Sequence, residues 1–265
     1  MKILPPHGCN STTKLIAAVR SAPTEFDRRK WIRNNWANTH SNSTQVIFVI
    51  ANHKDNDTNL RIQSEHEIYG DILWLDYEDG YYSLPMKNYG YYEYAIKYCP
   101  NTKCVLNLDS DTVVNLPGFE KLCAVSNESV PMITGKLYGG SPVVRDTYSK
   151  WYVPRYIYEK EIYPLYPYGW VKFITGLGAL QKLQDTLRIK TPFLVSENYR
   201  RLPEDSVYHG DVVHLAGIQL RDVGGINFGQ ISHWSDSSNG NQKIPLVVQV
   251  GEDHRDRIWK EMQTP

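Results

Sequence analysis

The sequence predicts an α/β fold in which helices cover both faces of a mostly parallel central sheet. Strand and helix patterns alternate through the first half of the chain, which is typical of parallel strands joined by helical crossovers. A β-branched run at Gln45–Ala51 is typical of a strand buried on both faces. The length of 265 residues fits one large domain or two small ones, and we expect a single domain over 1–265.

The first elements are defined by their ends. Lys14–Val19 is expected to form a strand, and the helix at Glu25–Trp36 has Thr24 in position as its N-cap. After the buried strand named above, a helix at Leu60–Tyr69 ends at Gly70.

The next elements lead to an acidic segment. A short strand is expected at Asp71–Leu75, and the helix at Leu84–Tyr98 ends before Pro100. The strand at Lys103–Leu108 runs directly into two carboxylates. The helix at Pro117–Val125 begins with a proline, which the first turn of a helix accepts.

The second half of the chain shows weaker periodicity. Residues 138–170 are rich in Tyr, Pro and Gly, and we expect loops and short strands over the sheet edge there. The other expected elements are strands at Lys172–Thr175 and Pro245–Val250, helices at Leu180–Leu187 and Asp253–Met262, and a loop followed by a helix within Glu204–Gly217.

The composition argues against a nucleic-acid partner and a structural zinc site. The chain has 29 basic and 29 acidic residues, whereas a duplex-binding protein usually shows a basic excess, so we expect no nucleic-acid partner. The cysteines lack CxxC or zinc-type spacing, which argues against a structural zinc site. Two disulfides of unknown pairing and buried free thiols both remain open for Cys9, Cys99, Cys104 and Cys123.

Sequons indicate a cellular compartment. The N-x-S/T pattern occurs in polar, loop-like contexts, which favours the lumen of the secretory pathway. No stretch is apolar over the roughly 18 residues that a membrane span needs. The four sequons begin at Asn10, Asn42, Asn56 and Asn127.

The sharpest chemical signal is the acidic segment that follows the strand at Lys103–Leu108. Asp109 and Asp111 lie one residue apart at the carboxyl end of this strand, where parallel sheets bind ligands. Mg²⁺ and Mn²⁺ prefer such oxygen ligands and share them with substrate phosphates. Two alternatives remain open. One is a simple acidic turn, and the other is a DxDxT-type phosphatase with Asp109 as nucleophile and Asp111 as general acid.

Several segments stand together in the order and spacing of a known family. They are Arg28–Trp36, the YGDI and DYEDGYYSLPMK motifs within Tyr69–Lys87, the DSD of Asp109–Asp111, the KWYV and YPLY motifs within Lys150–Tyr166, and the acidic pair Glu204–Asp205. With these motifs the chain resembles the β-1,3-galactosyltransferase and β-1,3-N-acetylglucosaminyltransferase family, glycosyltransferase family 31, which includes the Fringe enzymes.

The resemblance implies a GT-A glycosyltransferase fold with a Rossmann-like central sheet. Residues 14–125 would form the half that binds the nucleotide sugar, and residues 126–265 the half that binds the acceptor. The implied reaction is an inverting transfer of galactose or N-acetylglucosamine from a UDP-sugar donor to a glycan acceptor on a glycoprotein or glycolipid, in a β-1,3 linkage. The implied location is the Golgi lumen, with membrane contact only through an anchor that this chain lacks.

The resemblance also implies Mn²⁺ (or Mg²⁺) and a set of site residues. One general base suffices for a single in-line displacement, because the metal serves the leaving group. The assigned residues are Arg29, Asp79, Lys87 and Asp109 around the UDP-sugar, Asp109 and Asp111 on the metal, Asp205 as the general base, and Trp151, Trp170 and Glu204 at the acceptor.

The chain departs from the family pattern at several of these sites. Lys172 stands close after Gly169, where the family has a different pair of residues. The late metal-binding histidine of the family falls near Gln249, with His233 and His254 as possible substitutes. An inactive, carbohydrate-binding member of the same fold is therefore the alternative to an active transferase.

Overall fold

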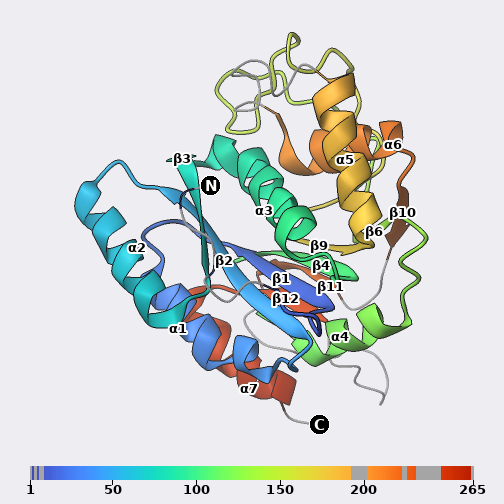
Figure 1. Ribbon diagram of the computed structural model, residues 1–265. Helices are drawn as coiled ribbons and strands as arrows, with labels where there is room; N and C mark the ends of the chain where they lie inside the picture. The colour runs from blue at the N-terminus through green and yellow to red at the C-terminus, as the bar shows by residue number, and fades with distance from the viewer. Residues whose placement is uncertain are drawn as a thin grey trace.

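A computed structural model describes residues 9–191, 202–222, 226–230 and 246–263, together with residues 2 and 5. Within these residues the strands form a seven-stranded sheet in the order β10-β6-β9-β4-β1-β2-β3 (Figure 1). Its strands are β1 (Leu15–Arg20), β2 (Thr44–Asn52), β3 (Ile72–Glu78), β4 (Cys104–Asp109), β6 (Met132–Gly135), β9 (Val171–Thr175) and β10 (Gln219–Asp222).

The sheet is mostly parallel, which confirms the predicted fold class. Strands β1, β2, β3 and β4 pair in parallel, and β6 pairs in parallel with β10. Strand β9 lies between β4 and β6 and is antiparallel to both. The short strands β6 and β10 carry no clear pattern of their own in the sequence and were not among the expected elements.

Helices cover both faces of the sheet, as predicted. In Figure 1, α3 and α5 lie on one face, and α1 and α7 lie on the other. Alternate residues of β1 enter the two cores, with Ile16 and Ala18 on the α3 and α5 side and Leu15, Ala17 and Val19 on the opposite side. The helices are α1 (Phe26–Asn34), α2 (Asn56–Tyr69), α3 (Leu84–Tyr98), α4 (Leu116–Val125), α5 (Leu177–Lys190), α6 (Val212–Leu215) and α7 (Arg255–Gln263).

Helix ends differ from the prediction where side chains cap the backbone. Helix α2 begins at Asn56 rather than Leu60, because the Asp55 carboxylate accepts hydrogen bonds from the first-turn amides. Thr24 is not the N-cap of α1. That position belongs to Glu25, whose side chain instead accepts from the Ala22 amide at 2.8 Å.

Helix α1 also ends two residues early. The chain enters a 3₁₀ turn at Trp36–Thr39, and the buried Trp36 indole donates to the Thr112 carbonyl at 3.0 Å. This contact ties the end of α1 to the segment that follows Asp111. A tertiary hydrogen bond therefore overrides the helical pattern at this point.

The C-terminal segment returns to the acidic strand end. Strand β12 (Val247–Gln249), which corresponds to the strand expected at Pro245–Val250, pairs antiparallel with β5 (Thr112–Val114) and parallel with β11 (Ile226–Gln230). Gln249 is opposite Thr112 in this register. The pairing therefore brings Gln249 to the segment that carries Asp111, although the two lie far apart in the sequence.

The region predicted to hold loops and short strands contains the two-stranded pair β7 (Leu137–Tyr138) and β8 (Tyr166–Pro167). Beyond it, the expected loop at Glu204 is a π-helix over Glu204–Asp211, which continues into α6. Single π-turns occur often at functional sites. Glu204 and Asp205 are the first two residues of this helix.

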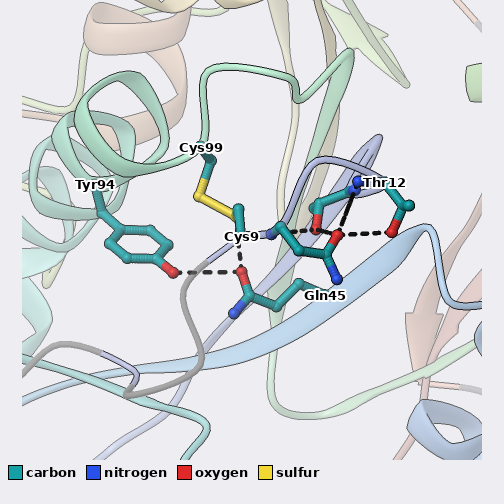
Figure 2. The surroundings of a disulfide bond; sticks show 7 residues. Cys9, Thr12, Gln45, Tyr94 and Cys99 are labelled. Atoms are coloured by element: carbon teal, nitrogen blue, oxygen red, sulfur yellow. Dashed lines mark hydrogen bonds between the residues drawn. A yellow bond between two sulfur atoms is a disulfide. The ribbon is translucent and has the colours of Figure 1, made fainter.

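All four cysteines form disulfides. Cys9 is bonded to Cys99, which follows α3, and Cys104 at the start of β4 is bonded to Cys123 in α4. Figure 2 shows the first of these beside Gln45 and Tyr94, whose hydroxyl donates to the Gln45 amide oxygen at 3.3 Å. Of the two alternatives that the sequence left open, free thiols and disulfides, the structure has the disulfides.

Candidate active site

A cavity of about 620 Å³ opens at the carboxyl ends of β1 and β4. This is the edge at which parallel sheets bind ligands. Its walls are rich in aromatic side chains, and its charged residues include Arg20, Asp109, Glu204 and Asp205. The aromatic residues that line it include Tyr81, Tyr138, Trp151, Tyr163, Tyr168 and Trp170.

Arg20 links the two carboxylates that come from opposite halves of the chain. It is the last residue of β1, opposite Asp109 in the β1–β4 register. Its Nη2 lies 2.6 Å from Asp109 Oδ1, and its Nη1 lies 3.0 Å from Glu204 Oε2. Burial alone would lower the pKa of Arg20, but Asp109 and Glu204 raise it, so the guanidinium is a permanent charge.

Asp109 is the more open member of this group. Its side chain is 35% exposed, while that of Arg20 is 2% exposed. Loss of solvation raises the pKa of Asp109, and the Arg20 charge opposes this effect. The carboxylate therefore faces the cavity with one oxygen held by the protein.

Glu204 is enclosed by donors from four elements. Its Oε1 lies 2.6 Å from the Asn88 amide nitrogen, 3.0 Å from Lys172 Nζ and 3.0 Å from His209 Nδ1, while Arg20 holds Oε2. Burial would raise the pKa of Glu204, but Arg20 and Lys172 hold it well below its usual range. Glu204 is thus an ionised, fully bonded carboxylate with little capacity left for an acceptor sugar.

Asp205 has a different environment from its neighbour. Its Oδ1 accepts from the Ser206 amide at 2.9 Å, and its Oδ2 accepts from the Gly169 amide at 3.4 Å. Both contacts come from the backbone, and the residue lines the cavity. Asp205 and Asp109 therefore face the same cavity, and Glu204, which also contributes to its lining, has a side chain that is only 10% exposed.

Asp111 has one satisfied and one orphaned oxygen. Its Oδ2 accepts from the Gln249 amide at 2.7 Å, and its Oδ1 is buried without a hydrogen-bond partner among the residues that the structure describes. A buried, unpaired carboxylate oxygen is costly, and a cation would satisfy it. The described residues contain no cluster of three His, Cys, Asp or Glu side chains suited to a metal.

These residues nevertheless fit Mn²⁺ or Mg²⁺. Such cations commonly use one or two carboxylates together with substrate phosphates and water. Asp109 and Asp111 would supply the carboxylates, Asp109 from the large cavity and Asp111 from a small pocket that Arg28 and Ser110 also line. The Gln249 side chain would supply an amide oxygen if its amide, whose nitrogen now donates to Asp111, were rotated by half a turn. Of the two histidines considered as substitutes, His254 lies in a turn beside Arg257, and His233 is outside the described residues.

Arg29 does not lie in the cavity. Its side chain is fully buried, with Nη2 2.6 Å from Glu65 Oε2 and Nη1 2.8 Å from the Ala22 carbonyl. The neighbouring Arg28 is the arginine beside the acidic segment. Arg28 bonds to Glu25 and Glu252 and lies 3.5 Å from the Ser110 hydroxyl.

Asp79 and Lys87 form a buried pair near the end of β1. Lys87 Nζ lies 2.9 Å from Asp79 Oδ1 and 2.7 Å from the Ser21 carbonyl. Burial lowers the pKa of Lys87, and Asp79 opposes this effect. The structure therefore brings the predicted pair together, at the segment that follows Arg20.

The two tryptophans assigned to the acceptor both line the cavity, but they differ in exposure. The Trp151 side chain is on its rim and 59% exposed, while Trp170 is buried in its wall. The Trp170 carbonyl accepts from the Asp109 amide at 3.0 Å. Trp151 thus has an exposed ring with the Lys150 ammonium over one face, 4.6 Å from the ring centroid, and Trp170 supports the strand end.

Comparison with known proteins identifies the family. A family model described as Galactosyltransferase matches residues 27–215, which span Asp109, Asp111 and Asp205. The chain belongs to the galactosyltransferase family. The resemblance seen in the sequence is confirmed, and the chain is a glycosyltransferase.

Relatives of this galactosyltransferase chain cover most of its length. It is 26% identical over 267 residues to a protein named beta-1,3-galactosyltransferase 1 from Homo sapiens, covering 98% of this chain and 77% of the relative. It is 28% identical over 213 residues to a human lactosylceramide 1,3-N-acetyl-beta-D-glucosaminyltransferase, covering 73% of this chain and 56% of the relative. These relatives do not favour the phosphatase alternative.

A solved structure is also similar in part. A glycosyltransferase involved in the glycosylation of the major capsid of PBCV-1 shares 13% sequence identity with the chain, at a TM-score of 0.40. The match covers 95% of this chain and 100% of that one.

Sequence reasoning missed three charged residues of this galactosyltransferase site, namely Arg20, Arg28 and Lys172. Arg20 had a usable signal, because it is a charged residue at the end of an otherwise apolar strand. Arg28 is adjacent to the predicted Arg29, and neighbouring helix positions point about 100° apart. Lys172 was noticed only as a departure from the family pattern, since nothing in the sequence shows that it reaches Glu204.

Proposed function

We propose that the chain is an inverting hexosyltransferase that moves galactose or N-acetylglucosamine from a UDP-sugar to a hydroxyl of a glycan acceptor, forming a β-1,3 linkage. The observation that carries this proposal is that Asp109 and Asp205 face one cavity. The names of the relatives support the hexosyl transfer and the linkage. The reacting groups are assigned as follows.

The donor side comprises the strand ends of the first half, residues 14–125. Asp109 and Asp111, with the Gln249 amide, would hold Mn²⁺ or Mg²⁺, which when bound neutralises the departing diphosphate. Lys87 and Asp79 would lie near the nucleotide through the Ser21 segment. Arg29 acts only indirectly, because its guanidinium fixes the Ala22 carbonyl, and the cation nearest the acidic segment is Arg28.

Asp205 would be the general base on the acceptor side, residues 126–265. It accepts the proton of the acceptor hydroxyl while that oxygen attacks the anomeric carbon from the face opposite the diphosphate. The bond from the anomeric carbon to the diphosphate oxygen breaks in the same displacement, which inverts the configuration. The backbone donors from Ser206 and Gly169 orient the carboxylate but leave lone pairs free for the hydroxyl.

Trp151 would stack against an acceptor sugar at the cavity rim. Aromatic rings with exposed faces suit the flat apolar faces of sugars. Glu204, which was expected to contact the acceptor, has its carboxylate filled by protein donors. We therefore assign Glu204 a supporting role behind Asp205.

The test is release of UDP from a panel of UDP-sugars and glycan acceptors in the presence of Mn²⁺, with Asp205→Asn as the control. General-base catalysis contributes about 10²–10⁴-fold, so we expect the variant to lose that much activity while it still binds UDP. Absence of transfer from every donor would sink the proposal. Sugar binding that is insensitive to a chelator, without transfer, would favour the inactive carbohydrate-binding alternative.

We further propose that the enzyme works in the lumen of the secretory pathway, in the Golgi. Both disulfides are of a kind that persists in oxidising compartments. All four sequon asparagines, Asn10, Asn42, Asn56 and Asn127, are exposed. Across the described residues, none of the helices has the length and apolar character to span a membrane. Sensitivity of the expressed protein to an N-glycan-removing enzyme tests this location, and a mass unchanged by that enzyme would contradict it.

A further inference from the structure

Lys172 is a fully buried cation that the proposed reaction does not use. It lies on β9, in the interior of the sheet, and its side chain has no solvent exposure. Its Nζ is 2.7 Å from the Gly169 carbonyl and 3.0 Å from Glu204 Oε1. Burying an ammonium costs desolvation free energy unless the charge is paired and hydrogen-bonded, and these two contacts provide that pairing.

Both partners of Lys172 adjoin Asp205. Glu204 precedes Asp205 in the chain, and the Gly169 amide donates to Asp205 Oδ2 at 3.4 Å. Gly169 has a φ of 77°, a backbone conformation that glycine adopts readily and other residues rarely adopt. The Lys172 ammonium thus holds Glu204, which precedes Asp205, and Gly169, whose amide donates to the Asp205 carboxylate.

We propose that Lys172 is a positioning residue for Asp205, acting through Glu204 and Gly169. This inference rests on the proposed function, in which Asp205 is the general base. The step it serves is loss of the acceptor proton, which requires the carboxylate within hydrogen-bond reach of the hydroxyl. A small displacement of such a group can cost a large factor in rate.

The other partners of Glu204 do not duplicate this role. Arg20 connects Glu204 to Asp109 on the donor side. His209 lies on the same π-helix as Glu204, and burial lowers the pKa of its imidazole, so it is a neutral donor through Nδ1. Among the side chains that hold Glu204, Lys172 is the one that also bonds to Gly169.

The β4–β9 register allows a lysine to be introduced by mutation on the neighbouring strand, opposite Lys172. Asn107 is directly opposite Lys172 across these strands. The Asn107 amide nitrogen lies 3.4 Å from Asn88 Oδ1, and the Asn88 amide in turn lies 2.6 Å from Glu204 Oε1. A lysine at position 107 therefore starts beside the same carboxylate, because opposite residues in antiparallel strands have Cβ atoms about 5 Å apart.

The experiment compares wild type with Lys172→Met, with the double variant Asn107→Lys/Lys172→Met, and with Lys136→Met as the matched control. Lys136 pairs with Asp222 at 3.6 Å, is half exposed, and bonds to no carboxylate of the cavity. kcat, KM for the UDP-sugar and Tm are measured for each. We expect Lys172→Met to lower kcat at least about tenfold, a fraction of what a general base contributes, with KM for the UDP-sugar little changed.

The double variant should recover part of that kcat, and the control should match wild type. If Lys172→Met does not fold, Lys172→Gln takes its place, because its amide still donates to Gly169 but carries no charge for Glu204. A folded Lys172 variant with wild-type kcat would overturn this inference but leave the proposed function standing. A wild-type protein that transfers no sugar would overturn the proposed function and this inference with it.

Discussion

Arg20 and Arg29 are both buried and both bonded to a carboxylate, but the two carboxylates differ in exposure. Each ion pair has a nitrogen–oxygen distance of 2.6 Å. Glu65, the partner of Arg29, is 6% exposed, whereas Asp109, the partner of Arg20, is 35% exposed. The first pair is closed inside the protein and the second opens into the cavity. The two pairs therefore differ in the exposure of the anion and not in the burial of the cation, and the pair with the exposed anion is the one that lines the candidate site.

Arg29 was expected near the UDP-sugar from the family motif, but it bonds to Glu65 inside the protein. Arg29 and Arg33 lie four residues apart on α1, where like charges repel mildly. Glu65 of α2 removes this repulsion, because Arg29 and Arg33 both bond to its carboxylate at 2.6 Å. Both arginines therefore have carboxylate partners within the fold.

The largest effect should come from the open pair. Asp109→Asn keeps the shape of the side chain but removes the charge that faces the cavity. We expect transfer to fall by about 10²–10³-fold, the usual cost of losing one group that acts on developing charge. UDP release measures this loss, and thermal unfolding should show little change in Tm. Turnover within a few-fold of wild type would remove the distinction between the two pairs.

The buried Arg29–Glu65 pair should affect stability and not transfer activity. Glu65→Gln leaves two buried guanidinium groups without their shared carboxylate, which for a buried pair costs about 3 kcal/mol of unfolding free energy. Denaturant unfolding measures this loss. kcat per folded molecule should stay at the wild-type value, and a large fall in kcat would show that Arg29 reaches the donor after all.

Asp111 provides a third carboxylate between these extremes. Gln249→Ala removes the amide that bonds to Asp111 and that we propose as a group holding the cation. Loss of even an outer contact lowers metal affinity by about 10-fold or more, so we expect at least that loss. We expect a weaker Mn²⁺-dependent rise of Tm in the presence of UDP, because binding to the native state adds stability by mass action. An unchanged Mn²⁺ titration would exclude Gln249 from the metal site. His254→Ala serves as the control.

The smallest effect concerns pH. Burial would raise the pKa of Glu65, but Arg29 and Arg33 lower it below its ordinary value of about 4.3. The stability that Glu65 contributes is therefore present above that value and lost as the pH falls through the lower pKa of the folded state. Unfolding of wild type below pH 4 should be steeper in pH than that of Glu65→Gln. Equal slopes would contradict this origin.

The sequence predicted the first half of the fold well, because its strands are long and buried on both faces. The helix at Leu84–Tyr98 was predicted with the bounds that the structure has. Strands β6 and β10 have only four residues each, too few for a period to emerge. The reversed direction of β9 had no signal either, since a fully buried strand reads the same in either direction.

The site was predicted through its anions more completely than through its cations. Asp109 and Asp205 stand in recognisable motifs, and both line the cavity. Arg20 and Lys172 act through contacts with residues far along the chain, and only the sheet register brings them together. Glu204 was assigned to the acceptor through the family resemblance, whereas in the structure its carboxylate is bonded to Arg20 and Lys172.

The two disulfides share a position relative to the sheet. Cys9 and Cys99 precede β1 and β4, and Cys104 opens β4, so both crosslinks lie at the amino ends of strands whose carboxyl ends form the cavity. Asn10 and Asn42 stand at the same amino edge, just before β1 and β2. The two edges of the sheet therefore differ in how they are built. The amino edge is covalently braced and exposes the sequon asparagines Asn10 and Asn42, while the carboxyl edge holds the cavity and one sequon asparagine, Asn56, just beyond β2.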